Sequence, residues 1–167
     1  MCVDGIHFKI FEPSPFSKDW NSHKLGGAAL SYELVTCIAT GDIVAYNGPF
    51  PAGKWNDIKI FWNKKTKWQL KEAEWALGDL GYRGDRKILT KLDARDRQHS
   101  YAMGCARDRH ETVNRRLRQW GALNGAYRHD RWKHHLVFRA VIVIEQIKFE
   151  NGSPPFQVFN YIDPIVF

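Results

Sequence analysis

Three acidic residues stand where their side chains could gather a divalent metal ion. Asp4 lies near the start of an apolar N-terminal segment, Asp79 ends a short apolar run, and Glu111 lies inside a long amphipathic segment. Clustered carboxylates repel one another and need a compensating cation. Mg²⁺ takes oxygen ligands and keeps waters, which leaves room for phosphate. Two such ions can activate an attacking oxygen and stabilise a leaving one, so converging acids would indicate phosphodiester chemistry.

Each acid also has a simpler interpretation. Asp79 stands in a glycine-rich stretch, and Asp and Gly dominate turns. Asp4 can be a turn residue at the start of a strand. Glu111 can pair with Arg107 or Arg115, each four residues away on a helix. Residue type and spacing leave both interpretations open.

The positive charge of the chain is concentrated around the third acid. The 167 residues carry a net charge of +7, and positions 83–118 hold 11 Lys and Arg against 5 Asp and Glu. Such a block favours a polyanionic partner, most often nucleic acid, although a solvated basic face is the alternative. The side chains expected to hold phosphate are Arg107, Arg115, Arg116 and Arg118.

The composition is that of one globular domain. Hydrophobic residues make up 44% of the chain and aromatic residues 14%. No apolar run approaches the ~20 residues of a membrane span, and no secretory signal is visible, so no membrane association is expected. Cys2, Cys37 and Cys105 are odd in number and far apart, which predicts reduced thiols in an intracellular protein.

The acids must be positioned by alternating strands and helices. Apolar patterns predict strands at 2–11, 30–40, 43–46 and 74–79, helices at 56–62, 100–121 and 131–150, an exposed loop at 83–97, and an extended, docked tail at 156–167. This order predicts an α/β domain with a mixed sheet covered by helices. If the first and fourth strands are neighbours, Asp4 and Asp79 approach each other, and Glu111 reaches them from a helix beside the sheet.

Buried stripes follow from helical spacing. In the first long helix the predicted core residues are Met103, Ala106, His110, Val113, Leu117 and Trp120. In the last helix they are Leu136, Val137, Ala140, Val141, Ile144 and Ile147. Most Trp residues are expected in the core, whereas Trp20 and Trp55 lie in predicted loops and could stack on unpaired bases.

Four motifs occur in an order that resembles the DDE-superfamily nuclease domain of Harbinger-type transposases. They are Val3-Asp4-Gly5, the stretch Tyr46–Pro51 followed by Asp57, the stretch Leu77–Tyr82, and the stretch Arg109–Arg116. Residues 127–137 also fit the closing region of that family. Each motif alone is weak, but the ordered set covers nearly the whole chain, with 31 residues between Asp79 and Glu111.

The resemblance implies an RNase H-like fold and a DNA-cutting and strand-transferring activity that depends on Mg²⁺ or Mn²⁺. It implies Asp4, Asp79 and Glu111 as the metal-binding, catalytic triad, with Asp57 in a structural position. It also implies DNA as partner, a nuclear location, and the possibility of homo-oligomers or of a separate DNA-binding partner protein. Full-length relatives carry an N-terminal helix-turn-helix part, so residues 1–167 are expected to form a single nuclease domain without it. The alternative is a catalytically idle, domesticated or truncated remnant that binds DNA or protein.

Overall fold

A mixed β-sheet forms the centre of the molecule. The computed structural model describes residues 1–63 and 66–158. The strands are β1 (Cys2–Lys9), β2 (Asn21–Ser22), β3 (Gly27–Thr36), β4 (Ile43–Pro51), β5 (Ala76–Leu77) and β6 (Ile88–Leu89). β4, β3 and β1 pair antiparallel, whereas β1, β5 and β6 pair parallel, in the order β4-β3-β1-β5-β6; β2 pairs with the start of β3.

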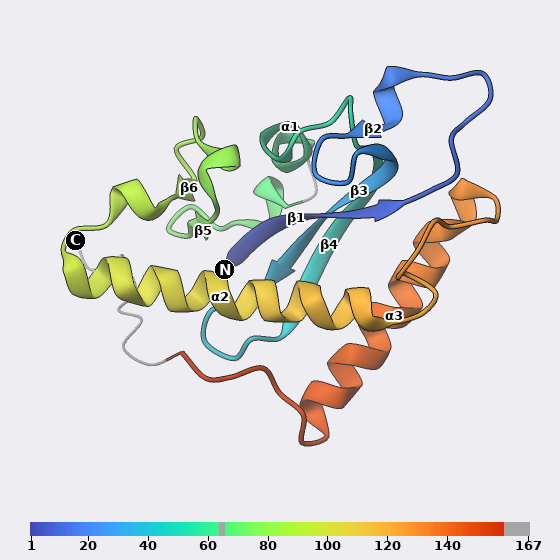
Figure 1. Cartoon of the computed structure of the whole chain (residues 1–167). Coiled ribbons are helices and arrows are strands. Elements are labelled where there is room, and N and C mark those ends of the chain that lie inside the picture. Colours follow the sequence, from blue (N-terminus) through green and yellow to red (C-terminus); the bar gives the residue numbers. More distant parts are fainter. Residues whose placement is uncertain (64–65, 159–167) are drawn as a thin grey trace.

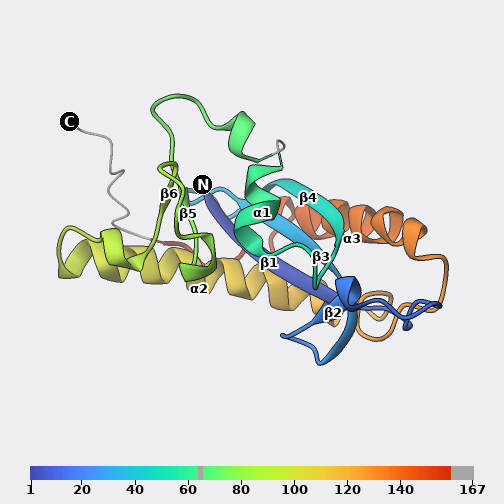
Figure 2. The ribbon, with the colours of Figure 1, turned by 90° about the horizontal axis from the view of Figure 1, so that it is seen from above.

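Helices cover both faces of the sheet. α1 (Asp57–Trp62) lies on one face, and α2 (Arg97–Gln119) and α3 (His134–Glu150) lie on the other (Figure 1), which the view from above also shows (Figure 2). Short 3₁₀ turns connect these elements: η1 (Lys18–Trp20), η2 (Lys67–Gln69), η3 (Leu80–Tyr82), η4 (Lys91–Asp93) and η5 (Arg131–Lys133). The α/β, RNase H-like fold expected from the sequence is therefore confirmed.

The two faces of β1 follow from its alternating side chains. Ile6 and Phe8 belong to the larger core with α2 and α3, whereas Val3 belongs to a second core that includes Phe61 of α1. Asp4 points to the same face as Ile6 because the two positions are two apart along the strand. Its side chain therefore faces α2, at the end of β1 where the apolar core gives way to polar residues.

Two predicted loops contain more structure than expected. Positions 83–97 include β6 and η4, because residues 88–89 continue the sheet beside β5 even though their neighbours are charged. Trp20 is buried rather than exposed, since it ends η1 and packs edge-on against Trp132 at a centroid distance of 6.3 Å. The idea that Trp20 stacks on bases is therefore wrong.

The predicted buried face of α3 is correct for Val141 but wrong for most of its other residues. Leu136, Ile144 and Ile147 are exposed, and the helix instead buries the face with His134, Phe138, Val141, Ile142, Glu145 and Phe149. Phe138 stacks on Tyr32 of β3 with ring centroids 4.0 Å apart. Both faces of this helix are apolar, so periodicity could not choose between them, and the larger aromatic rings occupy the core.

The buried stripe predicted for α2 is confirmed at five of its six positions, Met103, Ala106, His110, Val113 and Leu117, and the sixth residue, Trp120, is half-buried. None of the described helices has both the length and the apolar composition of a membrane span. Of the predicted C-terminal tail, residues 159–167 lie outside the described residues.

Candidate metal centre

The parallel pairing of β1 and β5 brings the two aspartates to the same level. Cys2 is the register partner of Leu77, and each aspartate follows two residues later in its own segment. Asp4 is still within β1, whereas β5 has ended and Asp79 caps η3, where its Oδ1 accepts the Gly81 N–H at 2.8 Å. The turn interpretation of Asp79 and its placement beside Asp4 are thus both correct.

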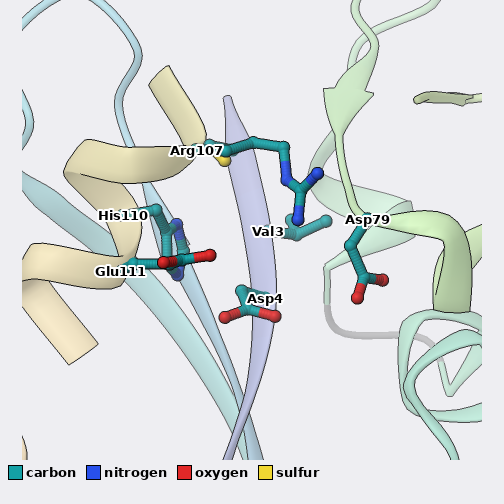
Figure 3. Close-up of a pocket in the computed structure, with 7 residues that line it drawn as sticks. Val3, Asp4, Asp79, Arg107, His110 and Glu111 are labelled. Atoms are coloured by element: carbon teal, nitrogen blue, oxygen red, sulfur yellow. The ribbon is translucent and has the colours of Figure 1, made fainter. Parts of the chain in front are cut away.

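The three acids line one pocket of about 80 Å³. Glu111 reaches it from α2, Asp79 from the turn after β5, and Asp4 lies between them, with Arg107 at the rim (Figure 3). The other lining residues are Cys2, Val3 and His110. At roughly 30 Å³ per water, such a volume suits a hydrated ion.

Burial makes the charge of Asp4 unfavourable. Desolvation is the main cause that raises the pKa of Asp4 from 3.8 to about 6, while Lys24 lowers it and Asp79 and Asp57 raise it further. Its oxygens accept two hydrogen bonds, from the Gly5 N–H and from Asn114 Nδ2, each at 2.8 Å. The carboxyl group is therefore held in one orientation but lacks enough positive charge around it.

Asp57 approaches this cluster from the opposite face of the sheet. A Cβ atom at Gly5 would lie 2.1 Å from Asp57 Oδ1. A Cβ atom at Gly81 would lie 3.1 Å from Asp57 Oδ2 and 3.0 Å from Asp79 Oδ1. Asp57 therefore packs against both glycine backbones, which explains why a glycine follows each of the two candidate aspartates, Asp4 and Asp79, within two residues. The structural position expected for Asp57 remains a prediction, and this packing agrees with it.

Lys24 supplies a cation on the same side. Its Nζ lies 3.3 Å from Asp57 Oδ2, and it is the main positive charge that lowers the pKa of Asp4. Asp57 is nearly buried while Lys24 is half-exposed. Lys24 thus offsets part of the repulsion among the carboxylates and remains accessible to solvent.

The arginines of α2 differ in what they can still bind. Arg107 lines the pocket, and Arg115 and Arg118 are exposed on the same helix. Arg116 donates to the Ser153 and Pro154 carbonyls, and its role in phosphate binding stays a prediction. Among the described residues no ion pair within 4 Å joins an arginine to Glu111, so the simpler interpretation of Glu111 is not supported.

His110 is a packed histidine, as its place on the apolar stripe indicates. It is buried, its Nδ1 shares a hydrogen bond of 2.9 Å with Thr36 Oγ1, and burial lowers its pKa to about 3. The ring is therefore neutral at physiological pH and braces α2 against β3 beside the pocket.

The donor set fits a hard divalent cation, but the site is not preformed. Carboxylate oxygens are the ligands that Mg²⁺ prefers, and a cation would stabilise the ionised form of Asp4, whose pKa is raised mainly by burial. Within residues 1–63 and 66–158, however, no three His, Cys, Asp or Glu side chains lie close enough together to hold a metal ion. Closure around an ion therefore requires side-chain movement, which the exposed Glu111 can make most easily.

Two contacts of the cluster were missed by sequence reasoning. Asn114 lies three residues after Glu111, on the helix face that carries it, and this spacing could have placed it near Asp4. Lys24 lies in the predicted loop that also carries Trp20, and nothing in the local pattern points to Asp57, 33 positions away.

The sheet is mixed, helices cover both of its faces, and an acidic pocket lies where β1 and β5 separate. Together these features define an RNase H-like α/β domain. The family model described as DDE superfamily endonuclease matches residues 3–145. The chain therefore belongs to the DDE superfamily of endonucleases and is a nuclease domain of the transposase type. Comparisons with curated proteins and with solved structures give no match.

Proposed function

We propose that this domain is a divalent-metal-dependent DNA nuclease of the Harbinger type, which cuts and joins phosphodiester bonds. Asp4, Asp79 and Glu111 act as the metal ligands. The observation that carries the proposal is their common pocket, together with the unfavourable burial of the Asp4 charge. A bound Mg²⁺ or Mn²⁺ would supply a Lewis acid at the scissile phosphate and would activate the attacking water.

The protein's own side chains prepare this site. Asn114 and the Gly5 N–H fix the carboxyl group of Asp4, and Asp57 holds the backbones that carry Asp4 and Asp79. Because the Asp4 carboxyl group and these backbones are already held, the movement needed to close the site around an ion falls mainly to Glu111.

The basic face of α2 binds the DNA backbone. Arg107, Arg115 and Arg118 are four residues before, four after and seven after Glu111, so all of them lie on the same face of the helix. Each phosphate neutralised releases counterions, so DNA affinity should fall steeply with salt. Replacing two of these arginines should reduce the salt slope by about 2.

The test is nicking of supercoiled DNA with Mg²⁺, with Mn²⁺ and with EDTA. The wild-type domain should nick in a metal-dependent way, and Asp79→Asn should lose most of that activity. Asp108→Asn, an exposed carboxylate on α2 one turn before Glu111, is the matched control and should nick like wild type. Equal nicking by wild type and Asp79→Asn would refute the proposal.

A second candidate function is a DNA-binding module without catalysis. It is favoured by the lack, among the described residues, of three side chains close enough to hold an ion. Salt-dependent DNA affinity, no metal-dependent nicking and no heat of Mg²⁺ binding by calorimetry would together support this alternative.

A further inference from the structure

A second pocket lies on the outer face of α1, away from the acids. It has a volume of about 420 Å³ and is lined by Lys54, Trp55, Lys59, Trp62 and Asn63. We call it the α1 pocket. Lys59 and Trp62 are three residues apart on one face of α1, and Trp55 lies in the segment just before the helix. Its volume falls in the range of small-molecule sites, about 300–1,000 Å³.

The two indole rings are held in place although they are accessible. Trp62 is 48% exposed, and its Nε1 donates to Asp85 Oδ2 at 2.7 Å. Asp85 in turn pairs with Lys67. Trp55 stacks on Phe50 with ring centroids 4.7 Å apart and an interplanar angle of 34°. Flat apolar surfaces fixed in this way lose little entropy when a second ring binds to them.

The charge around these rings is positive. Lys54 and Lys59 line the pocket and are exposed, and none of the described residues that line it is acidic. Lys54 has a distant partner in Asp19, at 3.7 Å, and both side chains are more than half exposed. Aromatic faces beside lysines are the surface that single-stranded nucleic acid uses, because every base has a face that stacks and every linkage has a phosphate.

The α1 pocket is linked to the metal centre through α1 itself. α1 begins at Asp57, which packs against Gly5 and Gly81 beside the acids. The helix has six residues, which corresponds to about 9 Å of length. Trp62 ends this helix, so the α1 pocket lies roughly one helix length from the end that packs beside the acids.

We propose that the α1 pocket binds an unpaired base of the DNA substrate, with the base against Trp62 or Trp55 and the adjoining phosphate at Lys59. This inference rests on the proposed action on DNA and adds a preference for unpaired substrate next to the cut. The pocket would then hold a strand that has been opened or released, while the basic face of α2 holds the duplex backbone.

The experiment measures the affinity of the protein for two DNA probes in EDTA. One probe is a single-stranded oligonucleotide that carries 2-aminopurine. The other is a hairpin duplex whose only unpaired bases lie in the linker that closes its loop. Trp62→Ala should weaken single-strand binding about 5- to 100-fold, as loss of one stacked base does, and should leave duplex binding within about twofold. Trp62→Phe should keep most of the affinity, and Lys59→Gln should lower the salt dependence. Tyr101→Ala, an aromatic residue 75% exposed on α2, is the control and should bind like wild type.

Several outcomes separate the possibilities. If wild type binds DNA but Trp62→Ala and Lys59→Gln bind single strands equally well, the inference is overturned while the proposed function stands. The inference is also overturned if folded Trp62→Ala loses affinity equally for single strands and for duplex. It is overturned as well if the α1 pocket binds an apolar peptide and its substitution leaves DNA affinity unchanged. If wild type binds no DNA in either form, the proposed function itself fails. Circular dichroism verifies that each variant is folded.

Discussion

Replacing Asp4 with asparagine should stabilise the metal-free protein at neutral pH. Burial is the main reason that the pKa of Asp4 rises from 3.8 to about 6, so its ionised form is disfavoured in the folded state. A difference of about two pKa units corresponds to an upper bound of about 3 kcal/mol. Asparagine keeps an acceptor for the Gly5 N–H. Asn114 Oδ1, buried without a partner, can accept from the new amide after a rotation.

The sign of the pH dependence follows from the raised pKa. Between pH 3.8 and about 6 the folded state binds a proton at Asp4 that the unfolded state has released, so stability falls as pH rises through this window. The penalty is absent below pH 3.8 and complete above about pH 6. The advantage of Asp4→Asn should therefore be small near pH 4 and reach about 1–3 kcal/mol at pH 7.5.

Urea unfolding in EDTA at both pH values measures this difference. Adding Mg²⁺ should stabilise wild type by mass action and should have little effect on Asp4→Asn, because a ligand of the proposed site is lost. Asp108→Asn, whose carboxylate is exposed, should match wild type throughout. A variant no more stable than wild type at pH 7.5, or a gain equal at both pH values, would refute the reasoning.

Three further predictions test the surroundings of the acids. Gly5→Ala should destabilise the fold by about 1–3 kcal/mol in urea unfolding, because its Cβ would lie 2.1 Å from a carboxylate oxygen. The control Gly27→Ala, whose Cβ would meet no atom within 4 Å, should cost little, and equal effects of the two variants would contradict the packing described. Lys24→Gln should raise the pKa of Asp4 and move the onset of Mg²⁺ stabilisation to higher pH, and an unchanged onset would argue against its electrostatic role. Burial lowers the pKa of His110 to about 3, so the free energy of unfolding decreases as pH falls below 6.5. His110→Gln should remove about 2 kcal/mol of this decrease between pH 7 and 5. The same pH dependence of urea unfolding in the variant and in wild type would count against this reasoning.

The parts of the site predicted from sequence are those carried by local patterns. Asp79 could be located because a strand signal ends in a glycine-rich turn, and Glu111 because helical spacing separates it from the apolar stripe. The neighbouring positions of β1 and β5 were expected on condition that the strands pair, and the register of Cys2 with Leu77 meets that condition. The metal-binding roles stay predictions, since the described residues approach one another without closing around an ion.

The parts that could not be predicted depend on contacts distant in sequence. The hydrogen bond from Asn114 to Asp4 spans 110 positions, and neither residue type demands it. For α3 the period was correct but most of the predicted face was wrong, because rings on the neighbouring strands, such as Phe8 of β1 and Tyr32 of β3, select Phe138 over the equally apolar Ile144. Local hydrophobicity specifies that a helix is amphipathic, whereas the complementary surface decides which side is buried.

The pocket also lies at a seam in the sheet. Strand β5 pairs with β1 through Cys2 and Leu77. Beyond that point β1 stays paired with β3, while the segment after β5 turns away into η3. A cation shared by Asp4 and Asp79 would tie the two edges together where ladder hydrogen bonds have ended. Ion binding would then stabilise the attachment of β5 to β1 in addition to its role in the chemistry. Amide hydrogen exchange in β5 and β6 should slow when Mg²⁺ is added, with β3 and β4 little affected.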